Sequence, residues 1–214
     1  MTNSTSYPIE PTVFLPDSYI FESKWYEKDF FHSPDGIQEF PNHHCKLTWL
    51  LSQPYVKHFR NAVDIGCRDG EYTRYLQEHF GHVYGFDPRF RKLFPRNIRK
   101  DKVTYFRCCV GNTICEYPRT DGNYGNPDWK DTIYPLDDFN LTNVDYIKID
   151  TDGFEYDIIK GADKTIRTYQ PLIVCEAQPD FRNQDRAIEL LEDQYNYHVV
   201  AVCPRNIDRI MLPK

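Results

Sequence analysis

One stretch constrains the fold more than any other: an apolar run at residues 144–149 that ends in three carboxylates. The run is rich in Val and Ile, and Asp150, Asp152 and Glu155 follow it around Gly153. A buried strand accommodates Val and Ile, whereas carboxylates there need partners or a chemical task. In an open α/β sheet, ligands sit at the carboxyl ends of the strands. The stretch therefore predicts a buried strand that brings acidic groups to an active-site edge.

Length and composition indicate one globular domain. The chain has 214 residues, of which 40% are hydrophobic and 27% charged, enough for a full hydrophobic core. No apolar stretch is long enough to span a membrane, and the polar N-terminus has no signal-peptide pattern. The seven cysteines form no C-x-x-C pair, which favours reduced thiols. We expect a cytoplasmic protein that binds no membrane.

The charge pattern speaks against a nucleic-acid partner. The net charge is −6, which does not favour a large surface for phosphate backbones. One basic run, at residues 89–102, contains seven Lys and Arg. Such a run is typical of a solvated surface, and the alternative is a surface that attracts an anionic, nucleotide-linked substrate.

The first 58 residues differ from the rest of the chain. They are rich in aromatic residues and prolines, with one helical pattern at residues 43–53 that places Leu47, Leu50 and Leu51 on one face. This aromatic content is too high for a disordered tail. We expect an N-terminal cap over residues 1–58, packed on a core domain over residues 59–214.

From residue 61 onward, strand and helix patterns alternate. Strands are predicted at residues 62–65, 82–86, 102–110, 144–149, 171–175, 198–202 and 208–212, and helices at 71–80, 154–169 and 185–194. Residues 111–131, with clustered Gly, Asn, Pro and Asp, are predicted to be a long loop. This alternation is typical of an α/β fold with a mostly parallel, doubly wound sheet.

The turn after the first strand favours a cationic cofactor. Asp64, Gly66 and Gly70 have the spacing D-x-G-x-x-x-G, which differs from the G-x-G-x-x-G of dinucleotide sites. An acid at this place repels a pyrophosphate and suits the sulfonium and ammonium groups of S-adenosylmethionine. Asp87, at the end of the second strand, is placed to bind ribose hydroxyls. The alternative is a structural turn with a capping Asp.

Taken together, these motifs resemble the FkbM family of class I S-adenosylmethionine-dependent methyltransferases. The family's V-D-[VI]-G-A-N-x-G is matched by residues 63–70, with Cys67 and Arg68 in place of Ala and Asn, and its E-P by Asp87-Pro88. Its T-L-D-D-[LF] appears at residues 135–139, with Pro in place of Thr.

The most specific motif of the family, K-[IV]-D-[VI]-E-G-x-E, is matched by residues 148–155, with Asp152 in place of Glu. A Gly-Ala pair at residues 161–162 and a strand ending in Glu176 follow in the family's order. The resemblance implies a Rossmann-like, seven-stranded sheet with helices on both faces. It also implies methyl transfer to oxygen, commonly on a sugar of a glycan or glycoside.

The residues expected to bind the cofactor and to act on the acceptor form two groups. The expected cofactor-binding residues are Asp64, Gly66, Cys67, Gly70, Thr73, Asp87 and Cys109. The expected catalytic residues are Lys148, Asp150, Asp152 and Glu176. The three carboxylates either remove the acceptor's proton or hold a divalent cation such as Mg²⁺. Lys148 either pairs with a carboxylate or, if its pKa falls, acts as a base.

Several neighbouring residues have weaker functional claims. His43 and His44 open the cap helix; adjacent side chains point apart, so the two are not expected to bind one metal together. A solvent-facing position is favoured for them over a general base. Trp25, Tyr26 or Trp129 could stack on a sugar. Glu155, at the start of a helix, is expected to shape or cap the turn rather than touch substrate.

Two other functions are weighed against sugar O-methylation. A nucleic-acid methyltransferase is disfavoured by the net charge and by the lack of an N/D-P-P-[YF] motif after the strand at residues 144–149. A non-catalytic binding module is disfavoured because Asp150, Glu155 and Glu176 are retained. We therefore expect a sugar, glycan or glycoside as the partner of this site.

Overall fold

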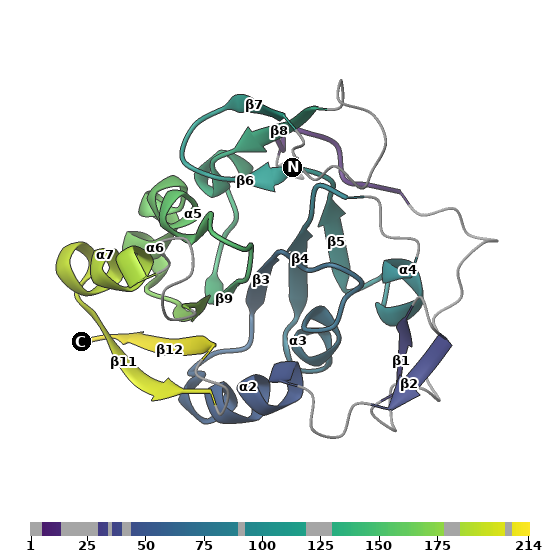
Figure 1. Cartoon of the computed structure of the whole chain (residues 1–214), viewed down its shortest axis with the longest axis horizontal. Coiled ribbons are helices and arrows are strands. Elements are labelled where there is room, and N and C mark those ends of the chain that lie inside the picture. The colour runs from purple at the N-terminus through teal and green to yellow at the C-terminus, as the bar shows by residue number, and fades with distance from the viewer. Residues whose placement is uncertain are drawn as a thin grey trace, which may run out of the picture.

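The computed structural model describes residues 6–13, 30–33, 36–39, 44–89, 93–118, 130–177, 185–203 and 207–214. A seven-stranded sheet in the order β11-β12-β10-β9-β3-β4-β5 forms its centre (Figure 1). The strands are β3 (Asn61–Ile65), β4 (His82–Phe86), β5 (Val103–Phe106), β9 (Val144–Ile149), β10 (Leu172–Glu176), β11 (Tyr197–Val202) and β12 (Asp208–Pro213). Neighbouring strands from β10 to β5 pair in parallel, and β12 pairs antiparallel with both β10 and β11. The predicted seven-stranded, mostly parallel sheet is confirmed.

Helices cover both faces of the sheet, and each face has its own apolar core. The helices α5 (Glu155–Gly161), α6 (Asp163–Tyr169) and α7 (Asp185–Tyr195) cover one face, and α2 (His44–Ser52), α3 (Thr73–His79) and α4 (Phe94–Asn97) the other. Side chains alternate between the faces along a strand. In β9, Ile147 packs under the first group of helices, whereas Tyr146 packs under the second.

The single helix predicted for residues 154–169 is wrong: α5 and α6 separate at Ala162. A Cβ atom on Gly161 would lie 1.8 Å from the carbonyl oxygen of Gly111. The last turn of α5 therefore packs directly on another backbone. This contact joins segments far apart in the sequence, so the apolar spacing within the helices does not reveal the break.

The single strand predicted for residues 102–110 is also divided. The sheet strand β5 ends at Phe106, and β6 (Cys109–Val110) joins a three-stranded sheet with β8 (Lys130–Tyr134) and β7 (Cys115–Pro118). The loop predicted for residues 111–131 thus contains β7, while residues 119–129 lie outside the described part. The helix η2 (Leu136–Phe139) then leads the chain towards β9.

The described parts of the N-terminal segment pack on the main core. The ring of Tyr7 lies 4.9 Å from that of Phe106, edge to face, and the Thr12 amide donates to the Tyr105 carbonyl at 2.8 Å. The hairpin of β1 (Phe30–Ser33) and β2 (Gly36–Glu39) lies beside α4 (Figure 1). The proposed division at residue 58 stays a prediction, as do the roles of Trp25, Tyr26 and Trp129, which lie outside the described residues.

The helix α2 buries a different face from the one predicted. Leu50 is 51% exposed, and the buried residues are Cys45, Thr48, Trp49 and Ser52. Two of these are polar, so apolar periodicity did not identify the face. The short helix η1 (Gln53–Tyr55) follows. None of the described helices is long and apolar enough to cross a membrane.

Candidate active site

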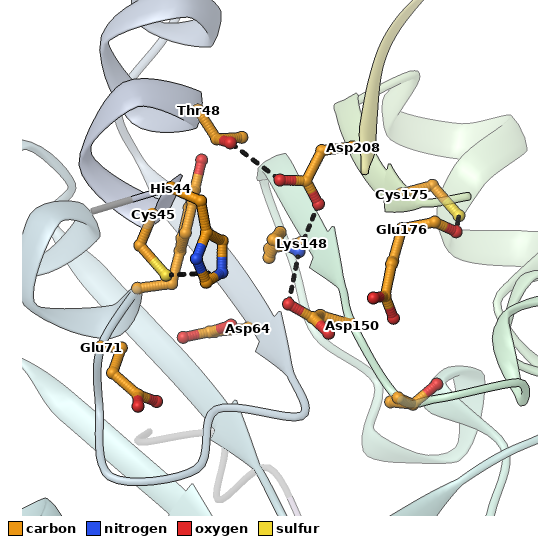
Figure 2. Close-up of polar contacts among 12 residues, drawn as sticks. His44, Cys45, Thr48, Asp64, Glu71, Lys148, Asp150, Cys175, Glu176 and Asp208 are labelled. Carbon is orange, nitrogen blue, oxygen red and sulfur yellow. Dashed lines mark hydrogen bonds and ion pairs between the residues drawn. The ribbon is translucent and has the colours of Figure 1, made fainter. Parts of the chain in front are cut away.

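The candidate site lies where β3, β9 and β10 end. β3 pairs with β4 on one side and with β9 on the other. The chain runs outward from β3 through β4 to β5 and then returns to β9 on the opposite side of β3. This is the topological switch point at which α/β sheets bind ligands. Figure 2 shows Asp64, Lys148, Asp150, Glu176 and Asp208 around this edge.

Asp64 and Thr73 face each other below the turn. Asp64 is 1% exposed, and the Thr73 hydroxyl donates to its Oδ2 at 2.5 Å. Burial raises the pKa of Asp64 to about 7, against the opposing effects of the Thr73 hydrogen bond and the positive charge of Lys148. The pair stabilises the β3–α3 turn, and direct contact of either side chain with a cofactor stays a prediction.

The two glycines of the turn have different structural reasons. Both have positive φ, +84° at Gly66 and +88° at Gly70. A Cβ on Gly66 would lie 1.8 Å from the Asp150 carbonyl oxygen, whereas a Cβ on Gly70 would meet only side chains at 3.4 Å or more. Gly66 thus allows the ends of β3 and β9 to touch, and Gly70 supplies a left-handed turn.

Asp87 is held by two backbone amides at the end of β4. Arg68 N donates to its Oδ2 at 3.1 Å and Arg89 N to its Oδ1 at 2.8 Å. These bonds orient the carboxylate at the end of β4, and its expected contact with ribose hydroxyls stays a prediction. Arg68 has a φ of +45°, a region that Asn, the residue of the family motif, adopts more readily.

The two cysteines expected to bind the cofactor lie in different places. Cys67 is buried in the turn, and a Cβ on Gly85 would lie 3.3 Å from its Sγ. Cys109 is half-buried in β6, beyond the carboxyl end of β5. Cofactor contact by either residue stays a prediction.

Lys148 is a buried cation shared between two carboxylates. Its Nζ lies 3.0 Å from Asp150 Oδ2 and 3.0 Å from Asp208 Oδ1, with side chains 33% and 1% exposed, respectively. Burial alone would lower the pKa of Lys148, but the two carboxylates raise it well above its ordinary value. Lys148 therefore stays protonated, and of its two expected roles the structure supports the ion pair.

Asp150 is the exposed member of this cluster. Burial pushes its pKa upward, but Lys148, a side-chain hydrogen bond with Glu176 and the charge of His44 together hold the pKa below its ordinary value. Asp150 is therefore a carboxylate at neutral pH. It presents an anionic oxygen at the mouth of the site.

His44 belongs to the site rather than only to the surface of the cap. It is half-buried, its Nε2 lies 3.5 Å from Cys45 Sγ, and Figure 2 shows its ring turned toward Lys148 and Asp150. The solvent-facing position favoured from sequence is thus wrong for His44. His43 lies outside the described residues.

The expected three-carboxylate metal site is not formed. In the part of the chain that the structure describes, no three His, Cys, Asp or Glu side chains gather as metal ligands would. Asp152 is exposed, with a φ of +57°, in the turn beyond Asp150. Asp150, Asp152 and Glu176 are thus not brought together as a ligand set in this part of the chain. A catalytic role for Asp152 stays a prediction.

Glu155 caps the turn, as expected. Its Oε1 accepts hydrogen bonds from Thr151 N at 3.0 Å, Thr151 Oγ1 at 3.0 Å and Gly153 N at 3.3 Å. Its Oε2 is buried without a partner. The side chain thus fixes the backbone that carries Asp150 and Asp152.

Sequence reasoning missed Asp208 and Thr48. Asp208 is fully buried at the start of β12, and Thr48 Oγ1 donates to its Oδ2 at 2.7 Å. The available signal was an acid at the first position of the strand predicted for residues 208–212. No local pattern pointed to Thr48, because its partner is 160 positions away.

Comparisons with known proteins agree with this geometry. The sequence profile of the methyltransferase FkbM domain matches residues 64–199. The chain belongs to the FkbM methyltransferase family. The match begins at Asp64 and contains β9, β10, Asp87, Asp150 and Glu176, whereas Asp208 lies beyond its end. No curated protein sequence is significantly similar to the chain.

Two solved structures share the fold. The FkbM methyltransferase of Methylobacillus flagellatus has a TM-score of 0.58 and 18% identity, over 89% of this chain and 50% of that one. The precorrin-8w decarboxylase of Methanobacterium thermoautotrophicum has a TM-score of 0.53 and 15% identity, over 94% of this chain and 100% of that one. The chain thus spans about half the length of the Methylobacillus protein. At these identities the likeness establishes the Rossmann-like fold of this family.

Proposed function

We propose that the chain is an S-adenosylmethionine-dependent O-methyltransferase that acts on a hydroxyl of a sugar, glycan or glycoside. The observation that carries the proposal is the placement of Asp150, an anionic carboxylate anchored by Lys148, at the switch point of a methyltransferase fold. Family membership supports methyl transfer, and the oxygen-rich site supports a polyol acceptor.

Asp87 and the turn at residues 64–70 would hold the cofactor. Asp87 is positioned by two backbone amides, and the acids at this edge suit the cofactor's positive charge. When bound, S-adenosylmethionine supplies the electrophilic methyl carbon.

Asp150 would orient the acceptor hydroxyl and take its proton. One carboxylate oxygen is fixed by Lys148, and the side chain remains 33% exposed. The acceptor oxygen becomes strongly acidic as its new bond forms, so a base with a low pKa suffices. Glu176 and His44 border Asp150 and would offer polar groups to the further hydroxyls of a sugar.

Calorimetry with S-adenosylhomocysteine tests the cofactor part of the proposal. We expect wild type to bind, and Asp87→Asn to bind about tenfold more weakly, a loss of about 1.4 kcal/mol. The control is Asp101→Asn, an exposed carboxylate in the turn before β5, which should bind as wild type does. Absence of binding by wild type, or equal binding by Asp87→Asn, would refute this part.

A screen with labelled S-adenosylmethionine tests the acceptor part. Free sugars, sugar nucleotides, glycosides and RNA or DNA oligonucleotides would be compared, and we expect label on a sugar oxygen. Asp150→Asn should lose about 100-fold or more in kcat, while exposed Asp157→Asn on α5 should behave as wild type. Label only on nucleic acid, or full activity of Asp150→Asn, would contradict the proposal.

A further inference from the structure

Asp208 is a buried carboxylate whose side chain bonds to residues outside its own strand, β12. It opens β12 opposite Glu176 of β10, and it is fully buried. A buried charge requires partners for its oxygens. Thr48 Oγ1 donates to Oδ2 at 2.7 Å and Lys148 Nζ to Oδ1 at 3.0 Å. Both oxygens are therefore held, from the helix α2 and the central strand β9.

Charge balance alone does not explain Asp208. Lys148 Nζ lies 3.0 Å from each of two carboxylates, and one carboxylate would balance its charge. A second buried carboxylate adds a negative charge that must also be removed from water, which is unfavourable unless it contributes something else. Its contribution is evident in the geometry, because a lysine ammonium ends a flexible four-carbon chain. Hydrogen bonds to Asp150, directly after β9, and to Asp208, in β12, fix the position of that ammonium.

The two carboxylates bound to Lys148 have different surroundings. Asp208 is 1% exposed, whereas Asp150 is 33% exposed and faces the site. Asp208 is thus the carboxylate held inside the protein, and Asp150 is the one that a substrate can reach. Lys148 connects them, with the ring of Tyr72 at 5.6 Å from Nζ.

We propose that Asp208, oriented by Thr48, is a positioning residue for methyl transfer: it sets Lys148, and through Lys148 the orientation of the Asp150 carboxylate. The inference rests on the proposed function. The chain Thr48–Asp208–Lys148–Asp150 begins in α2, whose first residue, His44, also faces the cluster (Figure 2). Docking of α2 on the sheet and alignment of the catalytic carboxylate are therefore coupled.

The test compares two substitutions of Thr48 that differ in one group. Thr48→Val keeps the shape and loses the hydroxyl, whereas Thr48→Ser keeps the hydroxyl. We expect Thr48→Val to lower kcat about tenfold, because a small misplacement of a catalytic group reduces turnover strongly. The affinity for S-adenosylhomocysteine and the KM for the acceptor should stay within about twofold of the wild-type values. Thr48→Ser should stay within about twofold of wild type in all three quantities.

Asp208→Asn provides the second arm. It should lower kcat by about 10- to 100-fold, and the double variant with Thr48→Val should be no slower than Asp208→Asn alone, because Thr48 acts through Asp208. Losses that multiply in the double variant would overturn the inference. If Asp208→Asn does not fold, the two Thr48 variants still decide.

A crystal structure of Thr48→Val gives a readout that does not depend on turnover. We expect the Asp150 carboxylate to rotate and its contact with Lys148 to lengthen. Unchanged Lys148 and Asp150, together with wild-type kcat, would overturn the inference while leaving the proposed function intact. A wild-type protein that binds S-adenosylhomocysteine but transfers no methyl group to any acceptor would instead overturn the proposed function, and this inference with it.

Discussion

Gly66 and Asp150 meet backbone to backbone at the ends of two neighbouring strands. A Cβ atom on Gly66 would lie 1.8 Å from the Asp150 carbonyl oxygen, too close for any side chain. Asp150 N in turn donates to the Ile65 carbonyl at 3.0 Å. The turn after β3 and the end of β9 therefore constrain each other directly.

This contact predicts that Gly66→Ala is far more harmful than Gly70→Ala. Both substitutions force a positive φ on Ala, at about 1–2 kcal/mol each, but only Gly66→Ala also displaces a backbone. We expect Gly66→Ala to destabilise the fold by at least about 2 kcal/mol more than Gly70→Ala in denaturant unfolding. Equal losses of unfolding free energy would show that the Asp150 contact is unimportant.

Glu155 caps the turn at residues 151–153, and we therefore expect Glu155→Ala and Glu155→Gln to differ in their loss of unfolding free energy. Ala leaves the amides of Thr151 and Gly153 without their acceptor, so we expect a loss of about 3 kcal/mol in the free energy of unfolding. Gln keeps the acceptor and removes a charge whose second oxygen is buried without a partner, so its loss should be about 1 kcal/mol or less. Denaturant unfolding measures both, and similar losses for the two would rule out the capping role.

The sequence was informative where one local pattern determined one element. The apolar run at residues 144–149 became β9, and Asp150 lies directly after it, beside the end of β3. The prediction for residues 154–169 missed the break at Ala162, next to which Gly161 packs against Gly111. Such a contact leaves no trace in helical periodicity.

The site, like the fold, was predictable only where a local sequence pattern marked a residue. Asp87 and Asp150 could be picked out because each follows a strand-like run, and Asp64 because of its spacing to Gly66 and Gly70; the structure brings their strand ends together. An ion pair of Lys148 with a carboxylate was also predicted, but its second partner was not, since Lys148 meets Asp208 across 60 positions. The expected metal ligands, Asp150, Asp152 and Glu176, are not gathered as a ligand set among the described residues.

A buried chain of hydroxyl groups behind the site predicts a non-additive effect. Tyr146 OH lies 2.8 Å from Ser52 Oγ and 2.5 Å from Tyr72 OH. Tyr146→Phe removes the partner at 2.5 Å from the Tyr72 hydroxyl and leaves that hydroxyl with Ser52 alone, so we expect a loss of about 1–3 kcal/mol. Tyr72→Phe leaves the Tyr146–Ser52 bond in place and should cost less.

The double variant of Tyr72 and Tyr146 to Phe supplies the check. It removes both hydroxyls, so no donor is stranded between them, and its loss should be smaller than the sum by about 1 kcal/mol. Thermal or denaturant unfolding of the four proteins gives the coupling free energy. Strict additivity would mean that the two hydroxyls do not interact.

Asp64 predicts an unusual pH dependence of stability. Burial raises the pKa of Asp64 to about 7 in the folded protein, whereas an unfolded Asp titrates near about 3.9. Between these two values the folded state holds a proton that the unfolded state has lost. The contribution of Asp64 to stability is thus complete below about pH 4 and is lost as the pH rises through about 7.

Asp64→Asn should remove this dependence, because Asn cannot ionise and still offers Thr73 an acceptor. Relative to wild type, the variant should gain up to about 4 kcal/mol of stability between pH 4 and pH 8. Taking the difference between the two proteins cancels the titration of the other groups, including Asp150, whose lowered pKa acts in the opposite direction. Thr73→Val is the matched test: the hydroxyl bond lowers the pKa of Asp64, so its loss should move the transition to higher pH. Denaturant unfolding across this range measures both effects, and a difference between Asp64→Asn and wild type that stays constant with pH would show that Asp64 titrates normally.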